Sequence, residues 1–138
     1  MLKKNSKTAT IVAGSIAIVL FLDQASKFVV LRYFSHIVSY NRGGAFGFGR
    51  NIDGYVFISI ALVAVSVFMV LYSIRSKPRL VLPFSLIMSG ASSNLLDRIL
   101  RSHVVDFIDP KIWPSFNIAD SAIFIGAVLV IWAEFRKR

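Results

Sequence analysis

Four aspartates lie within or beside long apolar stretches of this 138-residue chain: Asp23, Asp97, Asp106 and Asp120. Burial disfavours the charged form of a carboxyl group, so a carboxyl group in apolar surroundings keeps its proton to a higher pH. Two carboxyl groups that lie close together do not both ionise, and one then holds a proton while the other stays charged. This combination is what the acid-base activation of a water molecule requires. A fold that brings two of these aspartates together would therefore have the chemistry of a hydrolase.

Asp106 is the strongest catalytic candidate of the four. It stands at the centre of an apolar pentad, VVDFI at residues 104–108, where neither a helix cap nor an ion pair accounts for it. Asp120 follows Asn117 by three residues, and this spacing also fits a purely structural role as the first-turn acid of a helix that Asn117 caps. The sequence leaves both roles open for Asp120.

Asp23 and Asp97 each have a basic residue four positions later, Lys27 and Arg101. Residues at this spacing meet on one face of a helix, and ion pairing is the usual way in which a membrane span tolerates a charge. For Asp97 a structural ion pair is at least as well supported as a catalytic role.

A metal centre is not expected. The chain has no cysteine, and its two histidines, His36 and His103, are too few and too far apart for a zinc site. Hydrolytic chemistry would then depend on the carboxyl groups alone, without a cofactor.

The composition indicates a membrane protein. Apolar residues make up 56% of the chain and charged residues only 17%, and the mean hydropathy is +0.69. An average soluble domain has about 25% charged residues. The net charge of +9 comes from short basic clusters between long uncharged segments, which argues against nucleic acid as a partner because no basic stripe follows a polar face.

Four segments are long and apolar enough to cross a bilayer, which takes about 20 helical residues. They cover about residues 8–31, 55–74, 80–96 and 118–133, and the third is expected to continue through Asp97 and Arg98. We therefore predict an all-α integral membrane protein with four transmembrane helices, forming a single domain over residues 1–138.

Basic residues predict the orientation. The N-terminus, the connection between the second and third segments and the C-terminus hold nine Lys/Arg and one acid, so this side is expected to be cytoplasmic. The two outward connections, about residues 32–54 and 98–116, are the segments long enough to form more than a turn, and a small extracytoplasmic β-rich region is expected on this side. The glycine-rich stretch in the first connection favours a short irregular sheet, and Pro110 and Pro114 exclude a continuous helix in the second.

Five motifs occur in the order found in a known family: LDQASK at 22–27, YNRGGAFG at 40–47, NLLDR at 94–98, VVDFI at 104–108 and FNIADSAI at 116–123. In these motifs the chain resembles signal peptidase II, the bacterial lipoprotein signal peptidase. The resemblance implies a multi-pass aspartic endopeptidase of the cytoplasmic membrane, with its site toward the extracytoplasmic face. It implies that membrane lipids surround the enzyme and that its substrate is a prolipoprotein, cut immediately before a diacylglyceryl-modified cysteine. Because one chain contains all the candidate site residues, we expect it to act as a monomer.

By this resemblance Asp106 and Asp120 are the catalytic pair. The residues that it implies as lining, bracing or supporting the site are Asp23, Lys27, Asn41, Gly43, Gly44, Asn94, Asp97, Arg98, Asn117 and Ala119. The chain departs from the family pattern in two places. The segment between Asp23 and Asn41 is short, and Ser92 and Ser93 stand where a bulkier residue and a glycine are expected.

Two other kinds of protein fit part of the pattern. A small four-helix proton-coupled transporter also needs carboxylates inside the membrane, but usually near the midplane, whereas here they lie toward one end. A non-catalytic membrane scaffold would use the same polar residues only to join its helices.

Overall fold

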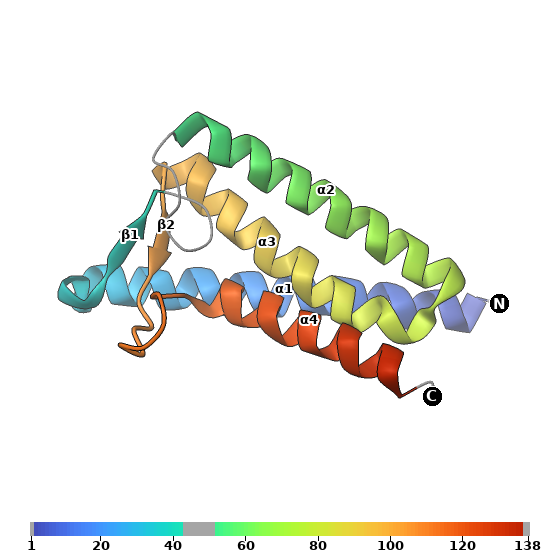
Figure 1. Ribbon diagram of the computed structural model, residues 1–138. Coiled ribbons are helices and arrows are strands. Elements are labelled where there is room, and N and C mark those ends of the chain that lie inside the picture. Colours follow the sequence, from blue (N-terminus) through green and yellow to red (C-terminus); the bar gives the residue numbers. More distant parts are fainter. Residues whose placement is uncertain (1, 43–51, 137–138) are drawn as a thin grey trace.

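The computed structural model describes residues 2–42 and 52–136. The predicted loop residues Gly43 and Gly44 lie outside the described residues. The described part contains four long helices (Figure 1), which are α1 (Leu2–Tyr33), α2 (Ile52–Ser76), α3 (Val81–Arg101) and α4 (Ile118–Phe135). The 3-10 turns η1 (Ser35–Ile37) and η3 (Pro78–Leu80) follow α1 and α2.

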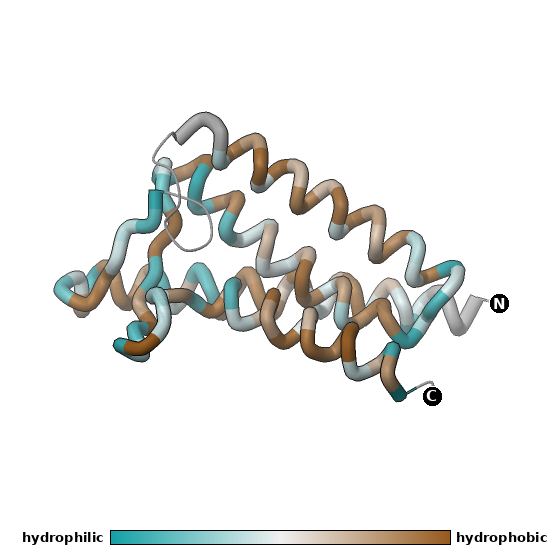
Figure 2. Tube along the Cα trace, in the orientation of Figure 1, coloured by the Kyte–Doolittle hydropathy of each residue, from teal (hydrophilic) through white to brown (hydrophobic). Residues whose placement is uncertain are grey.

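All four helices are long and apolar enough to span a membrane, as predicted. Each runs further than the apolar segment expected from the sequence, because backbone hydrogen bonding continues into the polar residues at the helix ends. Figure 2 shows α2 and α4 as mostly hydrophobic, with hydrophilic residues in the connections and in the parts of α1 and α3 nearest the sheet. The fold class is confirmed.

The third helix forms the core of the bundle. It packs against α1, α2 and α4, and 56% of its apolar window is buried, compared with 17–22% for the other three. Close packing against α4 depends on two glycines, because a Cβ at Gly126 would come within 2.7 Å of Pro83 O and one at Gly90 would meet Ala119 O. Small residues of this kind let two helix backbones approach closely.

Gly90→Ala is expected to destabilise the fold by about 1–3 kcal/mol, the usual cost of overpacking. Its Cβ would lie 2.8 Å from Ile123 Cγ1 and closer still to the backbone carbonyl of Ala119, which cannot move without shifting α4. Gly14→Ala is the matched control, because nothing lies within 4 Å of a Cβ there. Denaturation in detergent micelles measures both, and equal stability of the two variants would contradict this packing.

The predicted sheet is present, but its strands come from both connections and not from the first alone. The strands β1 (Ser39–Asn41) and β2 (Val104–Asp106) pair antiparallel, with Ser39 opposite Asp106 and Asn41 opposite Val104. After β2 the chain is non-helical as far as α4, as the two prolines predicted.

The sheet lies at one end of the bundle and both termini lie at the other (Figure 1). An even number of spans requires both termini to be on one side of a membrane. The expectation that this side is the cytoplasm rests on the charges of the loops.

Candidate active site

Asp106 is the last residue of β2 and is only 2% exposed. Two asparagines donate hydrogen bonds to its carboxylate. Asn117 Nδ2 lies 2.8 Å from Oδ1, and Asn41 Nδ2, from the paired strand, lies 3.2 Å from Oδ2. Ser39 is the residue opposite Asp106 in the sheet, and Asn41 reaches the carboxylate diagonally from the same strand.

Asp120 lies in the first turn of α4, and Asn117 caps that helix, as its spacing predicted. The backbone N–H of Asp120 donates to Asn117 Oδ1 at 2.9 Å, and the N–H of Asn117 donates to Asp120 Oδ2 at 3.3 Å. This reciprocal capping box fixes the start of the helix. The other carboxylate oxygen, Oδ1, accepts a hydrogen bond from Asn94 Nδ2 at 2.7 Å.

The two carboxylates are joined through one pair of side-chain amides. Asn117 Nδ2 donates to Asp106 and also to Asn94 Oδ1, at 3.1 Å, while Asn94 Nδ2 donates to Asp120. Asn117 is fully buried and Asn94 nearly so. Asn117 thus has two roles. It forms the capping box with Asp120, and it links Asp120 to Asp106.

The pKa of Asp106 is raised to about 7, first by burial and then by the negative charge of Asp120. The hydrogen bonds from Asn41 and Asn117 act in the opposite direction, because they stabilise the ionised form. The desolvation that the apolar pentad predicted is confirmed. The amides of Asn117 and Asn94 link the carboxyl groups of Asp106 and Asp120 directly.

A buried ionic cluster joins the helices next to this pair. Lys27 Nζ lies 2.6 Å from Asp23 Oδ2 on its own helix and 2.6 Å from Asp97 Oδ2 on α3, and all three side chains are fully buried. The predicted pair of Asp23 and Lys27 is confirmed. We refer to Asp23, Lys27 and Asp97 as the ionic cluster.

The ionic cluster also binds backbone groups near both candidate carboxylates. Asp23 Oδ1 accepts the N–H of Ala119 at 2.9 Å, and Asp97 Oδ2 accepts the N–H of Val105 at 3.3 Å. Ala119 immediately precedes Asp120, and Val105 immediately precedes Asp106. Arg101 also binds Asp97, as its spacing predicted. Asp97 therefore positions β2.

Arg98 lies one turn after Asn94 on α3, and its guanidinium donates to Asn94 O at 3.5 Å. The negative charges of Asp120 and Asp106 stabilise the charged form of this guanidinium. Of the ten supporting residues predicted, the eight in the described ranges all lie in or beside the network of carboxylates, amides and ionic cluster.

Two polar residues of this network were not predicted as site residues. Gln24 Nε2 donates to Asp97 Oδ1 at 3.0 Å and to Ser93 Oγ at 3.1 Å, and Ser93 Oγ donates to Asp23 Oδ2 at 2.6 Å. Gln24 stands within the motif at 22–27, and Ser93 immediately precedes the motif at 94–98. An amide side chain within an apolar span was the available signal for Gln24, and the departure from the expected glycine was the signal for Ser93.

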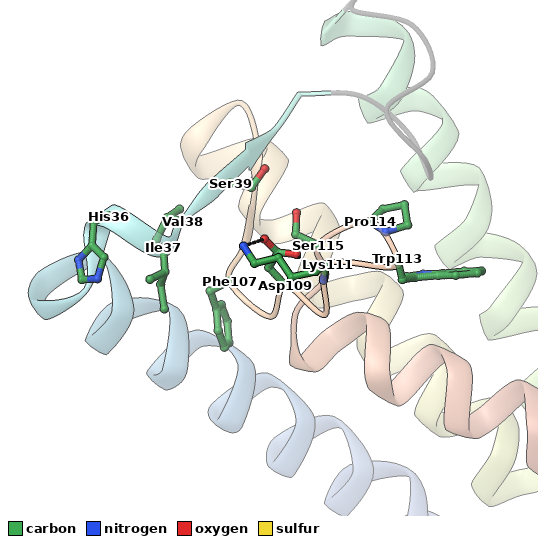
Figure 3. Close-up of a pocket in the computed structure, with 10 residues that line it drawn as sticks. All are labelled: His36, Ile37, Val38, Ser39, Phe107, Asp109, Lys111, Trp113, Pro114 and Ser115. Carbon is green, nitrogen blue, oxygen red and sulfur yellow. Dashed lines mark hydrogen bonds and ion pairs between the residues drawn. The ribbon is translucent and has the colours of Figure 1, made fainter.

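A pocket of about 690 Å³ lies between the two outward connections and does not include the carboxylate pair (Figure 3). It is lined by residues 36–39 on one side and by Phe107, Asp109, Lys111 and residues 113–115 on the other. The ion pair to Lys111, at 2.8 Å, lowers the pKa of the exposed Asp109. Asp109 is thus a solvent-exposed turn residue.

Among residues 2–42 and 52–136, no group of three or more His, Asp or Glu side chains is arranged to hold a metal ion.

The described fold and site define a class of protein. It is that of multi-pass α-helical membrane proteins with two carboxylates linked through side-chain amides at one end of the bundle.

Comparison with known proteins narrows this class. The family described as Signal peptidase (SPase) II matches residues 15–136. The chain belongs to this family of peptidases. The lipoprotein signal peptidase of Polynucleobacter necessarius is 40% identical over 140 residues, covering 87% of this chain and 86% of that protein. That of Burkholderia mallei is 37% identical over 144 residues, covering 90% of this chain and 87% of that protein.

Two solved structures have the same fold, and both are described as bacterial membrane enzymes. One superimposes with a TM-score of 0.76 at 27% identity, covering 91% of this chain and 87% of that one. The other has a TM-score of 0.74 at 27% identity, covering 96% and 95%. The likeness extends over nearly the whole described bundle.

Proposed function

We propose that this chain is an aspartic endopeptidase that removes the signal peptide from prolipoproteins, immediately before a diacylglyceryl-modified cysteine. Membership of the signal peptidase II family and the lipoprotein signal peptidases among its relatives support cleavage of prolipoprotein signal peptides. The observation that carries the catalytic assignment is the hydrogen-bonded pair of Asp106 and Asp120, joined through Asn117 and Asn94. Nothing in these comparisons supports the alternative function of a proton-coupled transporter.

In the mechanism that we propose, Asp106 and Asp120 hold one water molecule between them and share one proton. The ionised carboxylate takes a proton from the water as its oxygen attacks the scissile carbonyl carbon. The protonated carboxyl group hydrogen-bonds to the carbonyl oxygen as negative charge develops there. Collapse of the tetrahedral intermediate breaks the C–N bond, and the leaving amine takes a proton from the pair, which is restored to its one-proton state.

The surrounding residues would keep this pair in place. Asn117 and Asn94 donate hydrogen bonds to Oδ1 of Asp106 and of Asp120. Each Oδ2 accepts one hydrogen bond, from Asn41 or from the N–H of Asn117, and keeps a second lone pair for water or substrate. The ionic cluster holds the backbone next to each aspartate through Ala119 and Val105. Fixed geometry of this kind is a large part of catalytic power.

The position of the pair at the end of the bundle suits a lipid-modified substrate. We place the site at the extracytoplasmic face of the bacterial cytoplasmic membrane, where acyl chains stay in the bilayer while the peptide bond meets limited water. Burial of acyl chains contributes about 0.8 kcal/mol per CH₂ before losses. One chain contributes all the residues of the proposed site, so we expect a monomer to be active.

The test of this function is conversion of a precursor by the purified chain in detergent micelles. A prolipoprotein carrying a diacylglyceryl-modified cysteine should yield a mature product that begins with that cysteine, identified by intact mass. The same precursor without the lipid should be cut poorly. A transporter or a scaffold would produce no shorter product, and a product cut elsewhere would contradict the proposed specificity.

The cleavage rate is expected to fall on the alkaline side with a midpoint near pH 7, the pH at which Asp106 ionises. Below the midpoint the pair holds its proton, and above it both carboxylates are ionised and no proton donor is left. Because the hydrogen bond from Asn41 lowers the pKa of Asp106, Asn41→Ala should move the midpoint to higher pH. A midpoint that stays in place or moves down in a pH-rate profile would contradict this assignment.

A further inference from the structure

Ser93 makes a different hydrogen bond from the neighbouring buried serines of α3. Ser85 and Ser89 donate to carbonyl oxygens one turn back on their own helix, at 2.7 Å to Val81 O and 2.6 Å to Ser85 O. This is the ordinary bond of a serine inside a helix. Ser93 is equally buried but donates across to Asp23 Oδ2 on α1, at 2.6 Å. Its hydroxyl therefore joins two helices.

The same hydroxyl is held from a second side. Gln24 Nε2 donates to Ser93 Oγ at 3.1 Å and to Asp97 Oδ1 at 3.0 Å, and Gln24 Oε1 accepts from Arg101 at 3.1 Å. A hydroxyl that accepts from an amide and donates to a carboxylate has a defined direction. Ser93 thus lies inside the polar contact between α1 and α3.

Asp23 extends this contact to the candidate site. Its second oxygen, Oδ1, accepts the N–H of Ala119 at 2.9 Å. Ala119 is the second residue of α4, and the first N–H groups of a helix have no partner within the helix. The Asp23 carboxylate therefore supplies a partner for the first turn of α4, one residue before Asp120.

We propose that Ser93 is a positioning residue for Asp120. Its hydroxyl sets the plane of the Asp23 carboxylate, so that Oδ1 points at the N–H of Ala119 and holds the first turn of α4. As far as catalysis is concerned, this inference rests on the proposed function. Lys27 also binds Asp23 Oδ2, at 2.6 Å, so Asp23 keeps its counter-ion when the hydroxyl is removed. Loss of the hydroxyl should then disturb the geometry of the site more than the stability of the fold.

The first test compares the kinetics of Ser93→Ala and Ser89→Ala, two buried serines of one helix that differ in what they bind. Ser93→Ala is expected to lower kcat about tenfold with KM within about twofold, since misplacing a catalytic group slows the chemical step. Ser89→Ala should stay within about twofold of wild type. Ser93→Thr, which keeps the hydroxyl, should recover most of the lost kcat. Equal kcat in the two alanine variants, a loss confined to KM or failure of threonine to recover kcat would overturn the proposal.

The second test does not depend on activity. Hydrogen exchange of the Ala119 amide, followed by NMR in micelles, should be about tenfold faster in Ser93→Ala than in Ser89→Ala, because its acceptor is less well held. Equal exchange rates would overturn the proposal even in a chain that cleaves nothing. Failure of the wild-type chain to cut a lipid-modified precursor would instead contradict the proposed function, and the exchange rates would still decide the role of Ser93.

Discussion

Replacing either Asp106 or Asp120 by asparagine is expected to lower kcat about a thousandfold or more, with the chain still folded. An amide neither takes a proton from water nor donates one as a carboxyl group does, so each substitution removes half of the acid-base pair. Asparagine has nearly the shape of aspartate and keeps an acceptor oxygen for Asn117 or Asn94. Single-turnover cleavage of a lipid-modified precursor measures the loss.

Asp109→Asn is the control, because Asp109 is a solvated turn residue that binds Lys111. It should leave kcat unchanged. Near-normal turnover in either Asp106→Asn or Asp120→Asn would contradict the assignment of the pair.

The stability of Asp106→Asn separates loss of chemistry from loss of fold. Burial raises the pKa of Asp106 to about 7 in the folded chain, from the ordinary aspartate value of 3.8. The protonated form therefore favours folding at low pH, and that contribution is lost as the pH rises through 7. At pH 8 the asparagine variant should be at least as stable as wild type. A clear loss of stability at that pH would contradict burial as the cause of the raised pKa of Asp106.

Lys27→Met is expected to destabilise the fold by about 3–5 kcal/mol, the usual cost of breaking a buried ion pair. Methionine keeps much of the apolar stem but removes the charge that lies 2.6 Å from both Asp23 and Asp97. Two buried carboxylates would then lose a shared counter-ion, and the backbone contacts that they make beside the site would loosen. Denaturation in detergent micelles measures this loss.

Lys77→Met is the matched control for Lys27→Met. Lys77 pairs with Glu134 at 2.9 Å near the other end of the bundle, where both side chains are about one-third exposed. Ion pairs that reach solvent contribute about 0–1 kcal/mol. A similar loss of stability in the two variants would contradict the view that the ionic cluster is a central structural element.

Contacts that depend on spacing within one helix were predictable from the sequence. The four-residue spacing of Asp23 and Lys27 and the three-residue spacing of Asn117 and Asp120 each predicted a contact that the structure contains. The four spans were predictable for a related reason, because a long apolar run has few other stable conformations in a membrane.

Contacts between elements were not predictable in the same way. The bond of Lys27 to Asp97 and that of Ser93 to Asp23 depend on how α1 and α3 are rotated and shifted relative to each other. Hydropathy along the chain contains no information on that rotation. The pairing of β1 with β2 likewise depends on where the helices leave the two connections, which is why the sheet was expected in the first connection alone.

The candidate catalytic residues were predictable from the sequence only in part. The apolar surroundings of Asp106 indicated a perturbed carboxyl group, and the structure agrees. Its neighbour could not be chosen from local sequence alone, since Asp120 fitted a cap equally well. The resemblance in motifs supplied that choice, and the structure joins the two residues through Asn117.

The most direct test of the shared water is a high-resolution structure of the chain with a non-hydrolysable lipopeptide that carries a hydroxyl group at the scissile position. Such a hydroxyl takes the place of the attacking water in the tetrahedral intermediate. We expect it to lie within hydrogen-bond distance, about 2.5–3.0 Å, of both Asp106 and Asp120. A hydroxyl that contacts only one of them, or carboxylates that face away from each other in the complex, would contradict the mechanism.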